Sequence, residues 1–140
     1  MSRVETFEHT ADLGLRIRAG DLPDLFRGAA EGLFGVIVAN PESIRRVETD
    51  RVSISADGTE DLLVCWLSEL LFLCETKHRL YHEFEITISE DAKSLTATIF
   101  GEPIDRDRHL LDHEVKAVTR HGLSLRREGN EWVAEVIVDI

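Results

Sequence analysis

The chain has 140 residues, and its 43% hydrophobic content is enough to build the core of one domain over residues 1–140. Its formal net charge of −11 argues against a general nucleic-acid-binding protein, which is normally basic. No apolar run approaches the length of a membrane span, and the first residues lack the apolar centre of a signal peptide. We therefore expect a cytoplasmic protein without membrane contact.

The first forty residues predict two strands and a helix. Residues Val4–Phe7 form a short opening strand in this prediction. Apolar residues then alternate with other types over 13–17, which predicts a strand and places Asp12 on the face opposite the apolar one. Asp21 is a helix N-cap residue, and Asn40-Pro41 is a stop signal for the same helix.

A second strand-and-helix unit follows. Val52, Ile54 and Ala56 alternate as a strand, and a wide apolar stripe over 62–71 predicts the most buried helix of the chain. Both cysteines, Cys65 and Cys74, fall in this helix on opposite sides, so they cannot pair with each other. Free thiols fit a reducing compartment.

The remaining elements are predicted strands. Alternating residues over 84–88 and 95–99 form a hairpin around the turn at 90–93. A further strand begins at Leu123, turns at Gly129-Asn130 and leads into a terminal strand over 131–140. Two main helices set among antiparallel hairpins predict an α+β fold, with the helices packed on a mostly antiparallel sheet.

The segment 104–121 is highly charged and weakly periodic, and we expect a long loop. Three interpretations stay open. If it were helical, His109 and His113 could face one metal ion. Alternatively, Lys116 and the neighbouring arginines bind phosphate or an acidic surface. The third interpretation is a solvated loop without a site.

Carboxylates occur at both ends of the chain. Asp12 precedes the strand over 13–17, and Asp139 lies on the polar face of the terminal strand, one residue before the α-carboxylate of Ile140. If these two strands are neighbours, three anionic oxygen groups meet and require a cation between them. Oxygen ligands suit Ca²⁺, Mg²⁺ or Mn²⁺. The alternative is a turn residue and a solvated strand end.

Motifs of common enzyme classes are missing from the sequence. The glycines at 28, 32 and 35 lie within a predicted helix, and no Gly-Lys-Ser/Thr follows them. There is also no Gly-x-Ser-x-Gly motif, and no Ser or Cys lies beside an obvious base. We therefore expect a protein that is not itself an enzyme.

Six sequence blocks, in this order and spacing, resemble the archease family. The blocks are His9–Gly14, Leu25–Leu33, Leu62–Phe72, Gly101-Glu102, Glu114–Thr119 and Val138–Ile140. The resemblance covers essentially the whole chain, and it implies the archease-like α+β fold. One departure is Arg120, which stands before His121 where the family usually has Tyr or Trp.

The resemblance implies an accessory role in tRNA splicing. Archeases activate the RtcB-type RNA ligase: they promote its guanylylation and allow multiple turnover. The family binds a divalent metal ion, and the positions that match its ligands are Asp12, Asp139 and Ile140. Calcium is the ion expected in crystals, with Mg²⁺ or Mn²⁺ as candidates in cells. Lys116 matches a family lysine that is important for activation.

The expected partner is therefore an RtcB-type RNA ligase, and strong direct binding of nucleic acid is not expected. The acidic charge suits a partner that has a basic RNA-binding face. The resemblance also implies an alternative function, a chaperone-like binding module that modulates an RNA-processing or RNA-modifying enzyme. The two hypotheses differ in one respect, since only the first depends on Asp12 and Asp139.

Overall fold

A computed structural model describes residues 2–9 and 12–140 of the chain. Its elements, in chain order, are β1 (Arg3–His9), β2 (Asp12–Ala19), α1 (Leu22–Ile37), a 3₁₀ helix (Pro41–Ser43), β3 (Glu48–Ser55), α2 (Thr59–Lys77), β4 (Arg79–Ile88), β5 (Ser94–Pro103), β6 (Ala117–Glu128) and β7 (Glu131–Asp139). Thr10 and Ala11 of the first sequence block lie outside the described residues.

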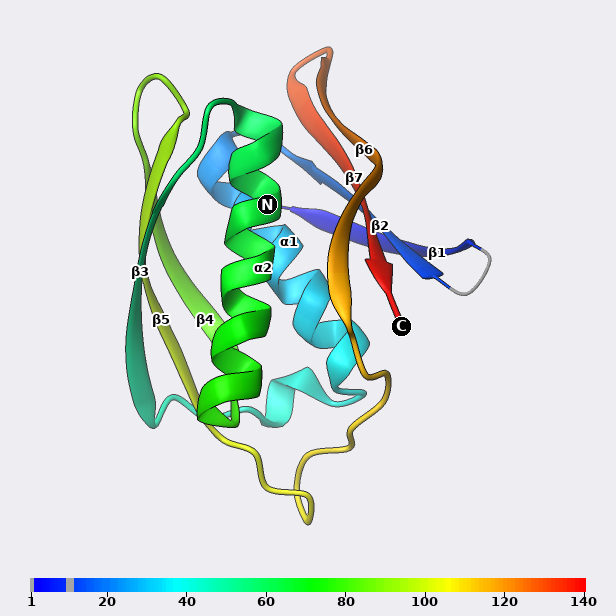
Figure 1. Ribbon diagram of the computed structural model, residues 1–140, viewed down its shortest axis with the longest axis vertical. Helices are drawn as coiled ribbons and strands as arrows, with labels where there is room; N and C mark the ends of the chain where they lie inside the picture. The colour runs from blue at the N-terminus through cyan, green and yellow to red at the C-terminus, as the bar shows by residue number, and fades with distance from the viewer. Residues whose placement is uncertain (1, 10–11) are drawn as a thin grey trace.

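The two helices lie between two antiparallel sheets (Figure 1). One sheet has the strand order β1-β2-β7-β6, and the other has the order β3-β5-β4. Helix α1 packs on β2 and β4, while α2 packs on β6 and β3, so each helix contacts both sheets. The predicted α+β class with two main helices is confirmed, and its strands divide between two sheets.

Local sequence signals explain the helix ends. The backbone N–H of Asp24 donates to Asp21 Oδ1 (2.8 Å), so Asp21 caps α1 as predicted. The C-cap of α1 is Val38, which forms an isolated bridge with Leu111, and the helix therefore ends before Asn40. The pairing of Val38 with Leu111 thus ends α1 at Ile37, before the predicted stop at Asn40-Pro41.

Helix α2 supplies much of the core. Its apolar stripe is buried, and Trp66 is completely buried, with Nε1 donating to the carbonyl of Phe26 on α1 (2.9 Å). This bond satisfies the one polar atom of the indole and fixes the two helices against each other. None of the helices in the described ranges is both long and apolar enough to cross a membrane.

Three strands, β3, β4 and β6, begin several residues earlier than the alternation predicts. The register of β4 shifts between Tyr81 and Glu83. The predicted loop over 104–121 is wrong at its end, because β6 already begins at Ala117. The register of β6 shifts between Thr119 and Ser124, and this irregularity interrupts the alternation that identifies a strand.

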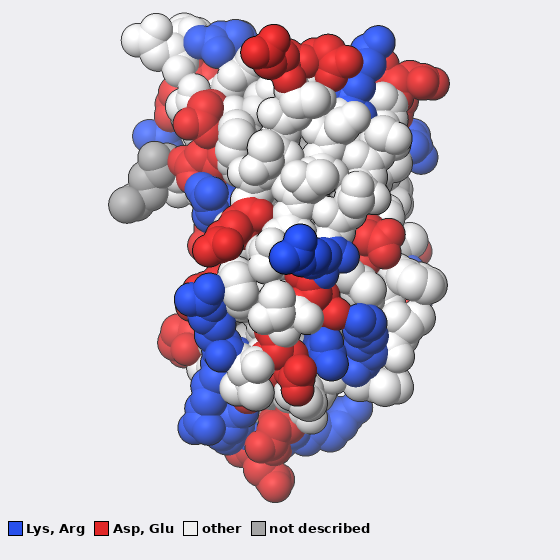
Figure 2. All heavy atoms as spheres, turned by 90° about the vertical axis from the view of Figure 1, so that its left-hand side faces the viewer, with Lys and Arg blue, Asp and Glu red and all other residues white. Residues whose placement is uncertain are grey.

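The outer face of the β3-β5-β4 sheet is divided into two parts (Figure 2). One part is uncharged, and the other mixes both signs of charge. Arg46, before β3, lies near Glu83 (3.6 Å) and Glu85 (4.0 Å) of β4. This visible face therefore offers no continuous basic surface for a nucleic acid, in line with the acidic composition.

The two cysteines are free and should differ in reactivity. Cys74 is buried and Cys65 is partly exposed. Burial, with a smaller contribution from Glu75, raises the pKa of the Cys74 thiol to about 11. At pH 8 we expect iodoacetamide to modify Cys74 about a hundredfold more slowly than Cys65, because alkylation needs the thiolate. Peptide mass spectrometry over time measures both rates, and equal rates would contradict the prediction.

Candidate functional site

The two predicted carboxylates lie directly across from each other on neighbouring strands. β2 and β7 pair antiparallel, and the register makes Asp12 the partner of Asp139. Partners in an antiparallel pair project to the same face of the sheet, with Cβ atoms about 5 Å apart. Both residues are partly buried. The structure therefore places two of the predicted site residues, Asp12 and Asp139, side by side.

Lys116 reaches the same end of the sheet from the other side of β7. Its backbone N–H donates to the carbonyl of Asp139 (2.8 Å), and Ala117 is the register partner of Asp139 on β6. Lys116 is exposed. Ile140 follows Asp139 directly and packs in part against the core. Lys116, Asp12, Asp139 and Ile140 thus all lie at the same end of the β1-β2-β7-β6 sheet, where β2 begins and β7 ends.

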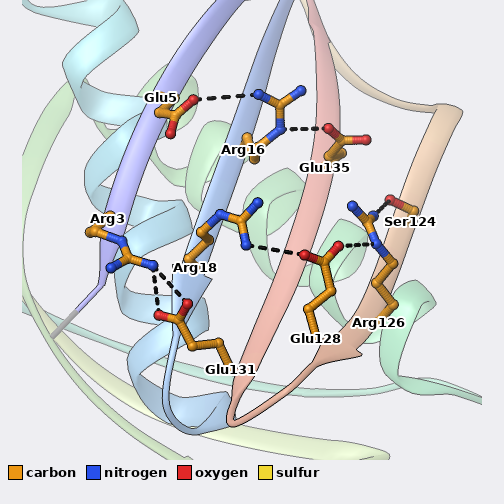
Figure 3. A network of polar contacts seen from close by, with 9 residues as sticks. All are labelled: Arg3, Glu5, Arg16, Arg18, Ser124, Arg126, Glu128, Glu131 and Glu135. Carbon is orange, nitrogen blue, oxygen red and sulfur yellow. Dashed lines mark hydrogen bonds and ion pairs between the residues drawn. The ribbon is translucent and has the colours of Figure 1, made fainter.

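The charges further along this face neutralise one another (Figure 3). Arg16 on β2 contacts Glu135 on β7 (2.7 Å) and Glu5 on β1 (3.4 Å). Arg18 contacts Glu128 (3.2 Å) in the same way. Each of these carboxylates contacts a guanidinium. Asp12 and Asp139 are cross-strand partners at the end of the same face.

Thr119 is a site residue that spacing did not single out. Its register partner is Ile137, so it lies on the same face as Asp139, one cross-strand row away. In the described part of the chain its Oγ1 is buried without a hydrogen-bond partner. A buried hydroxyl without a partner is costly. The hydroxyl is available to bind a water molecule or another polar group at this end of the sheet.

The donor set fits a hard divalent cation. Two carboxylates directly across a strand pair repel, and a cation between them removes the repulsion. All the predicted donors are oxygen atoms, which calcium and magnesium prefer. Among the described residues, no group of three or more His, Cys, Asp or Glu side chains forms a metal centre. Further ligands would therefore have to come from the main chain, Ile140 or water.

A second cluster holds the segment that leads to Lys116. Glu102 at the end of β5 is buried, and it accepts hydrogen bonds from the backbone N–H of Arg45 (2.7 Å) and from the guanidinium of Arg108. His109 is also buried, and its Nε2 lies 2.9 Å from Glu102 Oε2. Its Nδ1 accepts from the backbone N–H of Asp105 (2.9 Å), so the neutral ring donates through Nε2.

These contacts set the protonation of Glu102. Burial alone would raise the pKa of this carboxyl, but the donors at Arg45, Arg108 and His109 outweigh it and lower the pKa to about 2. Glu102 is thus ionised throughout the neutral range. The zinc interpretation of His109 and His113 is wrong, since the segment is not helical and both ring nitrogens of His109 are engaged.

The departure at Arg120 has a structural role. Its Nε lies 3.1 Å from Asp61 Oδ1 in the first turn of α2. Nearby, the backbone N–H of Leu125 donates to Glu60 (3.1 Å). The residue that replaces the usual aromatic therefore forms an exposed ion pair that joins β6 to α2.

Comparison with known proteins gives consistent matches over nearly the full length. The model of the Archease protein family (MTH1598/TM1083) matches residues 5–140. Protein archease of Pyrococcus abyssi is 34% identical over all of both chains. Protein archease of Methanopyrus kandleri is 38% identical over 97% of this chain and 98% of its own.

Two solved structures share the fold. The solution structure of Methanobacterium thermoautotrophicum protein 1598 is 34% identical, covers 98% of each chain and has a TM-score of 0.81. The crystal structure described as an archease and possible chaperone from Thermotoga maritima is 20% identical, covers 97% of this chain and 96% of its own, and has a TM-score of 0.65. With the family model matched over residues 5–140 and these relatives matched end to end, this chain is a member of the archease family.

Proposed function

We propose that this chain activates an RtcB-type RNA ligase of tRNA splicing in the cytoplasm, promoting its guanylylation and its multiple turnover. One observation carries the proposal: Asp12 and Asp139 are register partners, with the backbone of Lys116 bonded to Asp139. This arrangement suits a divalent cation that is presented at the edge of the protein. Family membership and the lack of an enzyme motif support an accessory role.

In this proposal Asp12, Asp139 and Ile140 hold the ion. When bound, the ion supplies positive charge that offsets the phosphates of GTP. Asp12 and Asp139 hold their carboxylates on one face, where β2 and β7 fix them. Thr119 offers a hydroxyl to a neighbouring water, and Lys116 adds a positive group beside the site.

The test is ligase guanylylation with GTP, a divalent cation and a substoichiometric amount of this protein. Asp12→Asn and Asp139→Asn each remove one charge at almost constant shape. We expect each variant to lose at least about tenfold in stimulation, as for a residue that acts in the reaction. The matched control is Glu135→Gln, on the same face but paired with Arg16, which should retain stimulation. Circular dichroism checks folding, and unchanged stimulation by both Asp variants would refute the proposal.

Lys116→Met should separate ion binding from activation. The side chain is exposed and no ion pair of Lys116 occurs within the described ranges, so its loss should leave the fold intact. We expect stimulation to fall by about tenfold or more, while calcium affinity measured by calorimetry changes by less than about threefold. A variant with full stimulation would remove Lys116 from the mechanism.

A chaperone-like function is the second candidate. It is favoured by the description of the Thermotoga maritima relative as a possible chaperone. Such a role depends on surface packing rather than on the carboxylates. If the two Asp variants still raise the yield of active ligase during refolding while stimulation of purified ligase is absent, this second function replaces the first.

A further inference from the structure

The ends of both helices and the segment over 104–115 enclose a groove of about 550 Å³. Its apolar lining includes Ile37 of α1, Leu71 of α2 and the buried Val115. The volume lies in the range of sites that take a small ligand or a few side chains of another molecule. No residue of the groove belongs to the carboxylate site described above.

The wall of the groove is a fixed part of the fold. The backbone N–H groups of Asp112 and His113 donate to the carbonyls of Ile37 (2.8 Å) and Val36 (3.1 Å) at the end of α1. The cluster around Glu102 holds the preceding residues. A groove that is formed before a ligand arrives binds it at a smaller cost in ordering.

Two leucines at this wall are exposed although their backbone is held. Leu110 is 60% exposed, and Leu111, which lines the groove, is 37% exposed. The N–H of Leu110 donates to Asn40 Oδ1 (2.8 Å), and its carbonyl accepts from the N–H of Ala39 (2.7 Å). Apolar side chains that a rigid backbone presents to solvent are typical of a protein-binding surface.

The rim of the groove is acidic. Glu75, Asp112 and Glu114 contribute three negative charges. The side chains that carry or can take positive charge there are Arg106, His78 and His113. With both histidines neutral, the net formal charge is −2, and α2 adds the negative end of its dipole where it terminates at Lys77. A cationic group is therefore favoured at this rim.

Two of these carboxylates, Glu75 and Glu114, differ from those on the sheet; the third, Asp112, lies 3.8 Å from His113. On the β1-β2-β7-β6 sheet, Glu128, Glu131 and Glu135 each contact an arginine. Across the described ranges, neither Glu75 nor Glu114 has an ion pair with Lys, Arg or His. Part of the acidic excess of the chain is thus placed, uncompensated, around an apolar groove.

We propose that this groove docks a basic segment of the ligase that carries an apolar anchor residue between Lys or Arg side chains. The inference rests on the proposed function for the identity of the partner. The anchor packs on Ile37, Leu71 and Val115, and the flanking cations meet the rim carboxylates. Val115 leads directly to Lys116, so a segment bound here lies next to the carboxylate site.

The test uses the double variant Glu75→Lys/Glu114→Lys in the intact chain. Its matched control is Asp57→Lys/Glu90→Lys, which makes the same charge change at exposed positions of another surface. The readouts are the affinity for purified ligase by calorimetry and the concentration that gives half-maximal guanylylation. We expect the groove variant to bind at least about tenfold more weakly with unchanged maximal stimulation, and its affinity to depend less on salt. Leu111→Ser should weaken binding about threefold or more.

The outcomes separate this inference from the proposed function. If the wild-type chain binds the ligase without stimulating it, the proposed function fails, and the groove variant still decides the docking site. If the groove variant binds the ligase with an affinity within twofold of wild type, the inference is overturned. It is also overturned if the wild-type chain does not bind the ligase at all. A dimer of this chain that the groove variant abolishes, seen by sedimentation, would assign the groove to a second copy and also overturn it.

Discussion

Glu102→Gln is expected to lower the free energy of unfolding by about 2 kcal/mol or more at pH 7, because it removes a buried charge that accepts several hydrogen bonds, even though Arg108 keeps its contacts with Asp105 and Ser43. Glu102 is 4% exposed and accepts from Arg45, Arg108 and His109. The glutamine keeps the size of the side chain but not its charge. Urea titration followed by circular dichroism measures the difference from wild type.

The difference should depend on pH in a defined direction. The pKa of Glu102 falls from its ordinary 4.5 to about 2 in the folded chain. A lowered pKa gives stability that is complete above about pH 4.5 and is lost as pH falls towards 2. The difference between wild type and Glu102→Gln should therefore be constant from pH 7 to 5 and shrink below pH 4.5. A difference that grew on acidification would contradict this assignment.

Asp50→Asn is the matched control. Asp50 is another buried carboxylate, which accepts from Lys77, Arg79 and Tyr81 where β3 meets α2 and β4. Its loss should destabilise the chain to a similar degree. Its partners Lys77 and Arg79 lie on either side of His78 at the rim of the groove, whereas Arg108 and His109 directly precede the wall that begins at Leu110. Once both chains are folded, Glu102→Gln should therefore weaken ligase affinity more than Asp50→Asn does. Equal affinities for the two variants would show that the Glu102 cluster has no role in docking.

If calcium binds the folded state alone, as the proposed site requires, it should stabilise the wild-type chain by about 2.7 kcal/mol at a free concentration one hundred times its Kd. Asp12→Asn and Asp139→Asn should lose most of this gain. Thermal unfolding with and without calcium chloride measures both effects.

A chain extension gives a separate test of Ile140. In the proposed site the α-carboxylate of Ile140 is a ligand. Residues added after Ile140 remove that carboxylate from the site, so calcium affinity should fall by about tenfold, as for the loss of one charged ligand. The same residues added at the N-terminus are the control. If both extended chains bind calcium like wild type, the terminal carboxylate is not a ligand.

Sequence reasoning succeeded where alternation is regular. The period of two over 13–17 and the β-branched run over 132–140 predict two strands, with Asp12 and Asp139 opposite their most apolar faces, and the structure pairs those strands. The cap at Asp21 and the stripe on α2 also follow from local rules. In each case neighbouring residues in the chain contain all the information that the prediction needs.

Features that depend on tertiary contacts were not predictable. The register shift in β6 between Thr119 and Ser124 interrupts the alternation of apolar residues, so the first part of this strand could not be predicted. The division of the strands into two sheets depends on pairing between distant residues, which no local pattern shows. The environment of His109 depends on Glu102 and Asp105, which the fold brings to its ring. A spacing of four residues to His113 suggested a metal pair, although the ring nitrogens bind elsewhere.

The strand order β1-β2-β7-β6 has a consequence for synthesis on the ribosome. β7, the last strand to emerge, is inserted between β2 and β6. Until it arrives, the nascent chain leaves an edge of each of these two strands unpaired, and such edges invite aggregation. The pairing of Asp12 with Asp139 is also made only at that moment. Chains truncated before β7 would therefore lack the pairing of Asp12 with Asp139 and would expose these strand edges to quality control.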